Sequence, residues 1–308
     1  MVVTDYLLHV FYLIDTECEA LNLSKRVRQR GPQPTLRDSE VITMEIAGEF
    51  FGIDTDKGIW QFFRRYHLAE FPALARVDRT TFARQAAALW RVKQLLHERV
   101  LALLPLSDPV DGQHWWIIDS FPLRTCRLAR APRCKLFRDI ARYGHDPTMP
   151  GHNSYFGLRV HLRTSDRGPI AQLALTGANV PDLDAAVELA PPNPHEPCLG
   201  DRNYWCAGNA HRLWQLAQAT MTLLAPFKKK SIDPDPQRSA TLTRMRQIIE
   251  TVIGQLATRF HAERTWARDL WHLTTRITRK VLSHTVAVLL NWRIGNPPLQ
   301  LDRLIDPA

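Results

Sequence analysis

The chain has 308 residues, 45% of them hydrophobic, which is enough for one large or two modest globular domains. Lysine and arginine outnumber aspartate and glutamate, and the formal net charge of +9 favours a polyanionic partner such as DNA or RNA. The five cysteines include no C-x-x-C pair, so neither a disulfide framework nor a zinc ribbon is indicated, and a reducing cytoplasm is expected. No apolar run reaches the roughly 20 residues that span a bilayer, and no basic stretch precedes the apolar N-terminus as in a signal peptide.

Residues 1–104 are predicted to be helical. Apolar residues recur at helical spacing over 36–52, and two further helices are expected within 57–68 and 78–104. Arginines are spread along the last two segments, as in a helix-turn-helix DNA-binding module. A plain helical bundle gives the same pattern, so both interpretations stay open.

The segment 105–112 contains two prolines, a glycine, two aspartates and a serine, a composition typical of a linker. We therefore expect a helical N-terminal region over 1–108, a second domain over 109–292 and a C-terminal tail over 293–308.

After this linker, the pattern indicates an α/β domain of order βββαβαβα. Short apolar or alternating runs predict the strands, and longer amphipathic runs predict the helices. The three first strands resemble a meander, whereas helical crossovers favour parallel pairing for the later ones. The expected elements, in chain order, lie within 115–120, 155–165, 169–177, 182–190, 197–201, 205–219, 220–227 and 238–262.

Three carboxylates occupy notable positions in this order. Asp119 ends the first strand, Asp201 ends the fourth, and Glu250 lies in the last helix. Neighbouring strand ends share one edge of such a sheet, so the three side chains are expected to converge. Converging carboxylates repel one another unless they hold divalent cations, and Mg²⁺ prefers oxygen ligands of this kind.

Each acid also has a plainer interpretation. Asp119 and Asp201 are both compatible with ordinary turn residues at strand ends. Glu250 lies four residues after Arg246, the spacing of a surface ion pair on a helix. The joint pattern of two strand-end acids and one helical acid favours the functional interpretation.

Five motifs follow one another along the chain: "IIDSFPL", "YFGLRVHL", "LTGANVPD", "GDRNY" and "RQIIETVIGQLATRFHAER". In this order they resemble the motifs of bacterial insertion-sequence DDE transposases of a branch whose first motif is Asp-Ser-x-Pro-Leu. The resemblance covers about 36–290 and implies an RNase H-like mixed sheet, with Asp119, Asp201 and Glu250 as the catalytic triad. It also implies two Mg²⁺ ions, for which Mn²⁺ can substitute, and binding of transposon ends by the N-terminal region.

Some positions depart from the family pattern. Related elements carry a Tyr-x-x-Arg-x-x-x-Glu signature that is followed after six residues by Lys; Arg246 matches it, but Thr243 and Ala257 replace the tyrosine and the lysine. Arg259 is a candidate substitute for that lysine. Asn203 stands where such motifs commonly carry glycine, which is compatible with a left-handed backbone there.

Basic residues surround the predicted acids and are expected to contact the DNA backbone. Trp266 and Trp271 are candidates for stacking on an unpaired base, although core positions are favoured. The predicted DNA-binding residues are Arg124, Arg127, Arg130, Arg133, Lys135, Lys228, Lys229, Lys230, Arg246 and Arg259.

The predicted function is therefore Mg²⁺-dependent cleavage of DNA at insertion-sequence ends and strand transfer into target DNA. The expected partners are a second copy of the chain and double-stranded DNA, both the terminal inverted repeats of the element and the target DNA. No membrane or nucleotide cofactor is expected. The resemblance also implies a bacterial, nucleoid-associated protein. The alternatives are a metal-dependent structure-specific nuclease or resolvase of the same fold, and a domesticated DNA-binding protein without catalysis. The intact acids argue against the last.

Overall fold

The computed structural model describes most of the chain as two compact units. One unit comprises Met1–Leu104 and Gln255–Ala308, and the other comprises Pro105–Gly254. No helix among the described residues is long and apolar enough to cross a membrane. The described residues are 1–21, 33–106, 114–146, 153–191, 196–206, 210–219, 221–229, 232–264 and 266–305.

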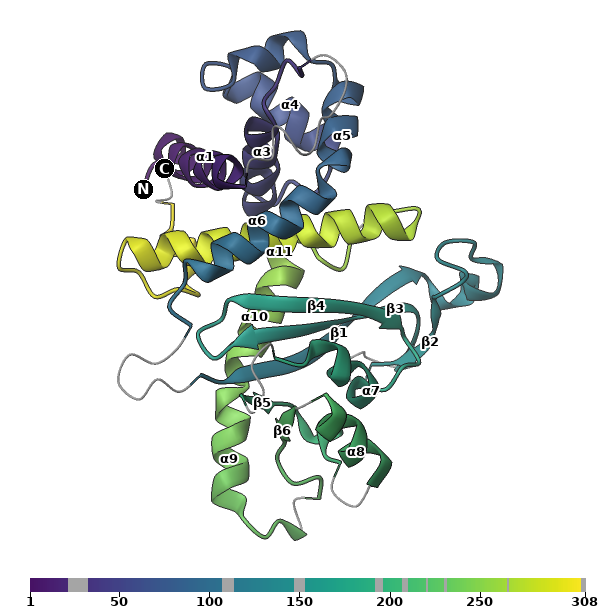
Figure 1. Cartoon of the computed structure of the whole chain (residues 1–308). Helices are drawn as coiled ribbons and strands as arrows, with labels where there is room; N and C mark the ends of the chain where they lie inside the picture. Colours follow the sequence, from purple (N-terminus) through teal and green to yellow (C-terminus); the bar gives the residue numbers. More distant parts are fainter. Residues whose placement is uncertain are drawn as a thin grey trace. The chain divides into compact units, whose positions relative to one another are not determined.

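The first unit is helical, as the sequence predicts. The helix α3 lies at its centre and contacts α1, α4, α5 and α11, while α11 also packs along α6 (Figure 1). Asp78 and Asp269 cap α5 and α11 by accepting backbone hydrogen bonds. The elements are α1 (Val3–Ala20), α3 (Asp38–Phe50), α4 (Asp56–Tyr66), η1 (Pro72–Arg76), α5 (Arg79–Ala88), α6 (Trp90–Ala102), α11 (Leu270–Arg293) and η6 (Leu301–Arg303), together with the end of α10 (Gln247–Thr258).

Buried ion pairs join the helices of this unit. The carboxylate of Glu45 lies 2.9 Å from Lys93 of α6 and 3.1 Å from Arg279 of α11. Glu49, one turn further along α3, lies 2.6 Å from Arg279 and 2.7 Å from Lys280. All these side chains are almost completely buried, so removing any one of them leaves an uncompensated charge in the interior.

The two units divide the chain differently from the boundaries expected from sequence. Residues 255–292 were expected within the second domain and 293–308 as a tail, but both belong to the same unit as the N-terminal helices. Arg279 and Lys280 of α11 neutralise the buried carboxylate of Glu49 on α3, so α11 packs against α3. The expected boundary at residue 108 lies outside the described residues. The single helix expected over 78–104 is two helices that meet at Leu89, and α9 (Pro236–Met245) and α10 are likewise separate helices that meet at Arg246.

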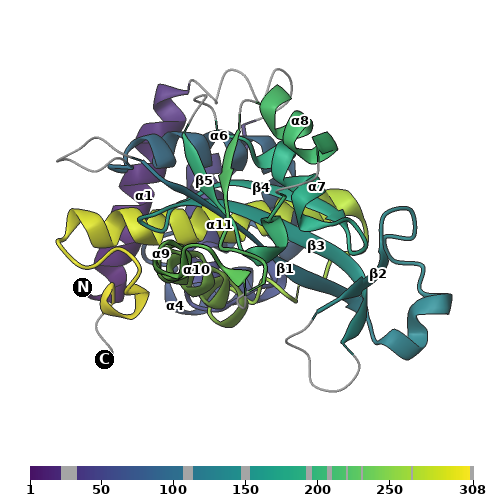
Figure 2. The same cartoon turned by 90° about the horizontal axis from the view of Figure 1, so that it is seen from below.

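The second unit is a six-stranded mixed sheet with helices on both faces. Its strand order is β2-β3-β1-β5-β6, with β4 paired to β3 alongside β2. In Figure 2, α7 and α8 lie on one face of the sheet and α9 and α10 on the other. The elements are β1 (Trp116–Cys126), η2 (Leu128–Arg133), β2 (Arg142–His145), β3 (Ser154–Ser165), β4 (Ile170–Gly177), α7 (Asp182–Ala186), η3 (Val187–Leu189), β5 (Pro197–Leu199), η4 (Arg202–Tyr204), α8 (Ala210–Gln218), β6 (Thr222–Leu224), α9 and α10.

The pairing confirms the predicted fold class. The strands β1, β3 and β4 form an antiparallel meander, and β5 and β6 continue the sheet in parallel beside β1. Helices connect the parallel strands, as expected for crossover connections. Together with the helical N-terminal region, this order makes the unit an RNase H-like mixed α/β domain.

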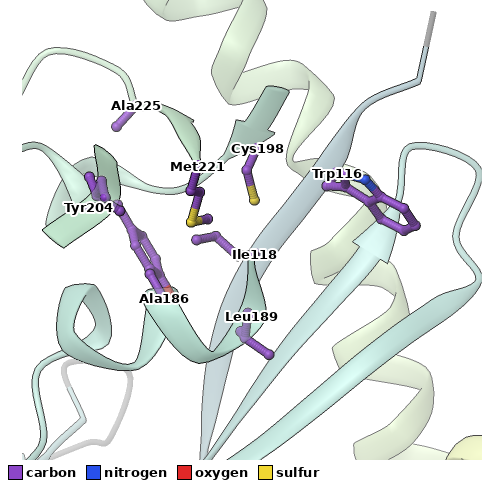
Figure 3. Packing of buried hydrophobic residues seen from close by; sticks show 9 residues of the cluster. Trp116, Ile118, Ala186, Leu189, Cys198, Tyr204, Met221 and Ala225 are labelled. Atoms are coloured by element: carbon purple, nitrogen blue, oxygen red, sulfur yellow. The ribbon is translucent and has the colours of Figure 1, made fainter. Parts of the chain in front are cut away.

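Apolar side chains between the sheet and α7, η3 and α8 form one core of this unit (Figure 3). Trp116 and Ile118 point from β1 to the same side, where they meet Leu189 and Tyr204. A side chain at Gly200 would place its Cβ 2.5 Å from the Tyr204 ring, so glycine is needed for this ring to pack against the end of β5.

Two local features differ from what the sequence suggests. The basic segment after β1 contains η2 and the short strand β2, neither of which is among the expected elements, and β2 pairs with the start of β3. Trp266 and Trp271 were favoured as core residues, but 69% and 43% of their surfaces are exposed. Trp266 lies before α11, and Trp271 lies in the first turn of that helix, whose buried residues begin at Leu273.

Candidate carboxylate site

Asp119 lies just beyond the point along β1 where pairing with the neighbouring strand β5 stops. The strand β5 pairs with Trp116 and Ile117 only, whereas β3 pairs with β1 along its whole length. Pro122, which cannot donate a ladder hydrogen bond, is therefore tolerated further along β1. The backbone N–H of Ser120 instead donates to Oδ1 of Asp119 at 2.8 Å and orients the carboxylate.

Asp201 follows β5 at the same level of the sheet. Leu199 pairs with Ile117, so two further residues of the same register bring Asp201 level with Asp119. The Asp201 carboxylate caps η4: Oδ1 accepts from the backbone N–H of Asn203 at 2.8 Å, and Oδ2 accepts from its side-chain amide at 2.9 Å. Asn203 lies in this 3₁₀ turn and does not have the left-handed backbone that its position suggested.

Arg246 connects Asp119 to the helical acid. Its guanidinium Nη2 lies 2.6 Å from Oδ2 of Asp119, and its Nη1 lies 3.6 Å from Glu250, one turn further along the chain. Arg246 is largely buried, whereas 56% of the Glu250 side chain is exposed. The ion pair expected between Arg246 and Glu250 is therefore present, but the arginine also holds the first acid.

The electrostatics indicate crowded negative charge. Burial raises the pKa of Asp119 to about 6; the charge of Asp201 adds to this rise, while Arg246 and the Ser120 N–H oppose it. Burial also raises the pKa of Asp201, and the charge of Asp182 contributes to the rise. The structure thus brings Asp119 and Asp201 within mutual electrostatic influence, with Arg246 as the compensating cation.

These side chains supply only oxygen donors, as a site for a hard divalent cation requires. In the part of the chain that the structure describes, however, no three His, Cys, Asp or Glu side chains gather closely enough to enclose a metal ion. Glu250 approaches the two aspartates through Arg246, whose guanidinium supplies the positive charge between them.

Sequence reasoning missed a polar cluster on the opposite face of β1. Asp182, the first residue of α7, accepts hydrogen bonds from the Ser120 hydroxyl at 2.6 Å and from Nη1 of Arg159 at 3.0 Å. His161, opposite Ser120 on β3, places Nδ1 3.6 Å from the same carboxylate. The available signal was Arg159 and His161 at alternate positions of a predicted strand, facing a covered side of the sheet.

Four predicted DNA-binding residues surround one cavity. The exposed side chains of Arg127, Arg130, Arg133 and Lys135 line a cavity of about 600 Å³ at η2. Arg124, at the end of β1, instead points to Asp146, 3.2 Å away. The structure therefore gathers most of this basic segment on one surface, adjacent in sequence to the strand that carries Asp119.

The remaining predicted contacts lie elsewhere. Lys228 and Lys229 are exposed after β6, and Lys230 lies outside the described residues. Arg259 belongs to the helical unit, where its guanidinium contacts Asp302 and the carbonyl oxygen of Phe50. This pairing occupies Arg259 within the protein, so its proposed replacement of the family lysine stays a prediction.

Asp119 was expected to end its strand, but β1 continues to Cys126, and it is the pairing with β5 that stops before Asp119. The strand order, with one acid within β1 and one just after the neighbouring β5, defines an RNase H-like domain with a carboxylate site. A family model described as a transposase DDE domain matches residues 111–270, just over half of the chain. The chain therefore belongs to the DDE transposase family. No curated protein and no solved structure matches it.

Proposed function

We propose that Asp119, Asp201 and Glu250 are the catalytic acids of this DDE transposase and hold Mg²⁺. The observation that carries this proposal is the register of β1 and β5, which, extended by two residues beyond the last pair, brings the first two acids level where β5 ends. The third acid is linked to them through Arg246, which contacts both Asp119 and Glu250. All three lie within the matched family domain.

The donor chemistry fits this assignment. Carboxylate oxygens are preferred Mg²⁺ ligands, and the raised pKa values of Asp119 and Asp201 reflect burial and crowding that a bound cation would relieve. Two bound cations would supply Lewis-acid stabilisation of the attacking and leaving oxygens of a phosphodiester. The side chains themselves form no covalent intermediate, so no serine or tyrosine nucleophile is required.

The proposed reaction has two phosphoryl-transfer steps. In the first, water attacks a phosphodiester at the element end and the bond to the 3′-oxygen breaks, which frees a 3′-hydroxyl. In the second, this hydroxyl attacks a phosphodiester of the target and displaces a target 3′-oxygen, so the number of phosphodiester bonds is conserved. Asp119, Asp201 and Glu250 keep the same positions in both steps.

Basic surfaces of both units are proposed to bind double-stranded DNA. Arg127, Arg130 and Arg133, which line the cavity at η2 after β1, would contact the phosphate backbone. In the helical unit, Arg64 of α4 and Arg84 of α5 are exposed, which supports recognition of the terminal repeats by this pair of helices. Joining two element ends would require two copies of the chain, so we propose a homodimer in the DNA complex.

The triad is tested by Asp119→Asn, Asp201→Asn and Glu250→Gln in the full-length protein. Each variant is expected to abolish Mg²⁺-dependent cleavage of a labelled element end and to retain DNA binding by gel shift. Glu263→Gln, which removes an exposed acid of the helical unit, is the matched control and is expected to cleave like wild type. Near wild-type cleavage by any triad variant would remove that residue from the site.

The same assay separates the alternative functions. Joining of the labelled end to a second DNA molecule distinguishes a transposase from a nuclease or resolvase that only cleaves. Absence of cleavage by the wild-type protein with every element end and divalent cation tried would favour a DNA-binding protein without catalysis.

A further inference from the structure

A fourth acid lies behind the proposed catalytic site. Side chains at Ser120 and Asp119 point to opposite faces of β1, because successive residues of a strand alternate. Asp182 accepts the Ser120 hydroxyl at 2.6 Å on the face that α7 covers, whereas Asp119 meets Arg246 on the other face. Asp182 is therefore adjacent to the site without being on its proposed metal-binding side.

The position of Asp182 is strongly determined. Nη1 of Arg159 lies 3.0 Å from both carboxylate oxygens, and Nη2 of the same guanidinium donates to the carbonyl of His145 at 2.8 Å. Only 14% of the Asp182 side chain and 16% of the Arg159 side chain are exposed. His161 approaches the carboxylate and is itself held by Thr176, which lies 2.8 Å from its Nε2. Charge-assisted hydrogen bonds at this level of burial fix the carboxylate in one orientation.

Ser120 connects this cluster to the proposed catalytic acid. Its hydroxyl is held by Asp182, and its backbone N–H donates to Oδ1 of Asp119 at 2.8 Å. The strand β5 no longer pairs with β1 at this level, so among the described residues no strand hydrogen bond from that side fixes the backbone of Asp119 and Ser120. The hydroxyl of Ser120 is thus an anchor for backbone that the sheet holds from one side only.

We propose that Asp182 is a positioning residue that fixes the Asp119 carboxylate through Ser120. Asp182 itself contacts neither DNA nor the reacting atoms. Its role follows the general pattern in which an outer group orients a metal-binding carboxylate through one intervening hydrogen-bonded residue. This inference rests on the proposed function for its catalytic consequence, but the positioning itself can be measured without catalysis.

The direct readout is hydrogen exchange of the Ser120 amide in metal-free, full-length protein. The wild-type amide is expected to be protected by its bond to Asp119, and Asp182→Asn and Ser120→Ala are each expected to speed its exchange by about tenfold, as loss of one hydrogen bond does. Ser120→Thr retains the hydroxyl and is expected to restore protection. Glu188→Gln removes an exposed acid from the neighbouring turn η3 and is expected to leave exchange unchanged.

The second readout is the Mg²⁺ concentration that gives half-maximal cleavage. Loss of an outer-shell partner is expected to raise this concentration by about 10- to 100-fold in Asp182→Asn and Ser120→Ala, with recovery in Ser120→Thr. Ser120→Ala carries no charge change, so it separates positioning from the electrostatic effect of removing Asp182.

Unchanged amide exchange and Mg²⁺ dependence in Ser120→Ala would overturn the inference, even if Asp182→Asn failed to fold. Altered exchange without any Mg²⁺-dependent cleavage in the wild type would instead support the positioning and contradict the proposed function. The two failures are therefore distinguishable.

Discussion

The guanidinium of Arg246 lies 2.6 Å from the carboxylate of Asp119, although the two residues are 127 positions apart in the chain. This ion pair joins the start of α10 to the centre of the sheet and places one cation beside two partly buried aspartates. It determines how the candidate site responds to pH.

Arg246→Gln is expected to move the pH dependence of cleavage toward higher pH. The arginine lowers the pKa of both Asp119 and Asp201, so both pKa values rise when its charge is removed. If the ionised acids are required, the acidic limb of the pH–rate profile shifts upward, whereas Arg246→Lys keeps the charge and is expected to shift it less. If the acidic limb of the pH–rate profile lies at the same pH in Arg246→Gln as in the wild type, ionisation of these carboxylates does not limit cleavage.

Asp119→Asn is expected to stabilise the metal-free protein at neutral pH. The pKa of Asp119 rises on folding from 3.8 to about 6, so the folded state holds this proton more tightly and loses stability as the pH rises through that window. Above the window, the neutral asparagine is expected to raise the free energy of unfolding by up to about 3 kcal/mol, and below pH 4 by little.

Denaturant unfolding at pH 4 and pH 7.5 measures this difference. Glu263→Gln, at an exposed position, is the control and is expected to show little change at either pH. If Asp119→Asn is less stable than the wild type at pH 7.5, the free energy gained from the ion pair with Arg246 exceeds the cost of burying the Asp119 charge.

Replacing Arg127, Arg130 and Arg133 by alanine is expected to weaken DNA binding and its salt dependence together. Each lost phosphate contact lowers the slope of log K against log salt by about 0.9, so the slope falls by up to about 2.7. Binding of a duplex at several salt concentrations measures this. Arg303→Ala, an exposed position of the helical unit, is the control, and an unchanged slope in the triple variant would exclude this surface from the DNA contact.

Arg279→Leu is expected to destabilise the helical unit by about 3–5 kcal/mol. The substitution leaves Glu45 and Glu49 buried with one fewer cation between them. Arg293→Leu removes an exposed arginine from the last turn of the same helix and is expected to have little effect. Equal unfolding midpoints for the two variants would contradict a stabilising role of the buried network.

The order of the main strands along the chain, and the positions of Asp119 in β1 and Asp201 just after β5, were predictable because they depend on local patterns. The apolar run before Asp119 and the alternation in β3 are visible in the sequence, and the predicted meander and parallel strands are confirmed. The strand β2 was not predictable from a four-residue segment, since its stability comes from pairing with β3.

Long-range charge pairing explains the other differences. From the sequence alone, Arg279 and Lys280 resemble exposed basic residues. Their buried ion-pair partner, Glu49, lies more than 200 positions earlier in the chain. Asp182 is visible within a motif, yet its contacts with Ser120 and Arg159 depend on how α7 packs against the sheet. No local sequence pattern indicates which residues form such long-range contacts.

The position of α11 after the strands of the sheet also sets an order of events during synthesis. The ribosome completes α3 first and produces the cationic partners of Glu45 and Glu49 on α11 roughly 230 residues later, which takes about 10–50 s at bacterial and eukaryotic elongation rates. All six strands of the sheet emerge within that interval. We therefore expect the nascent chain to form its α/β unit before its helical unit, so that the proposed recognition of element ends by the helical unit begins only after α11 has been synthesised.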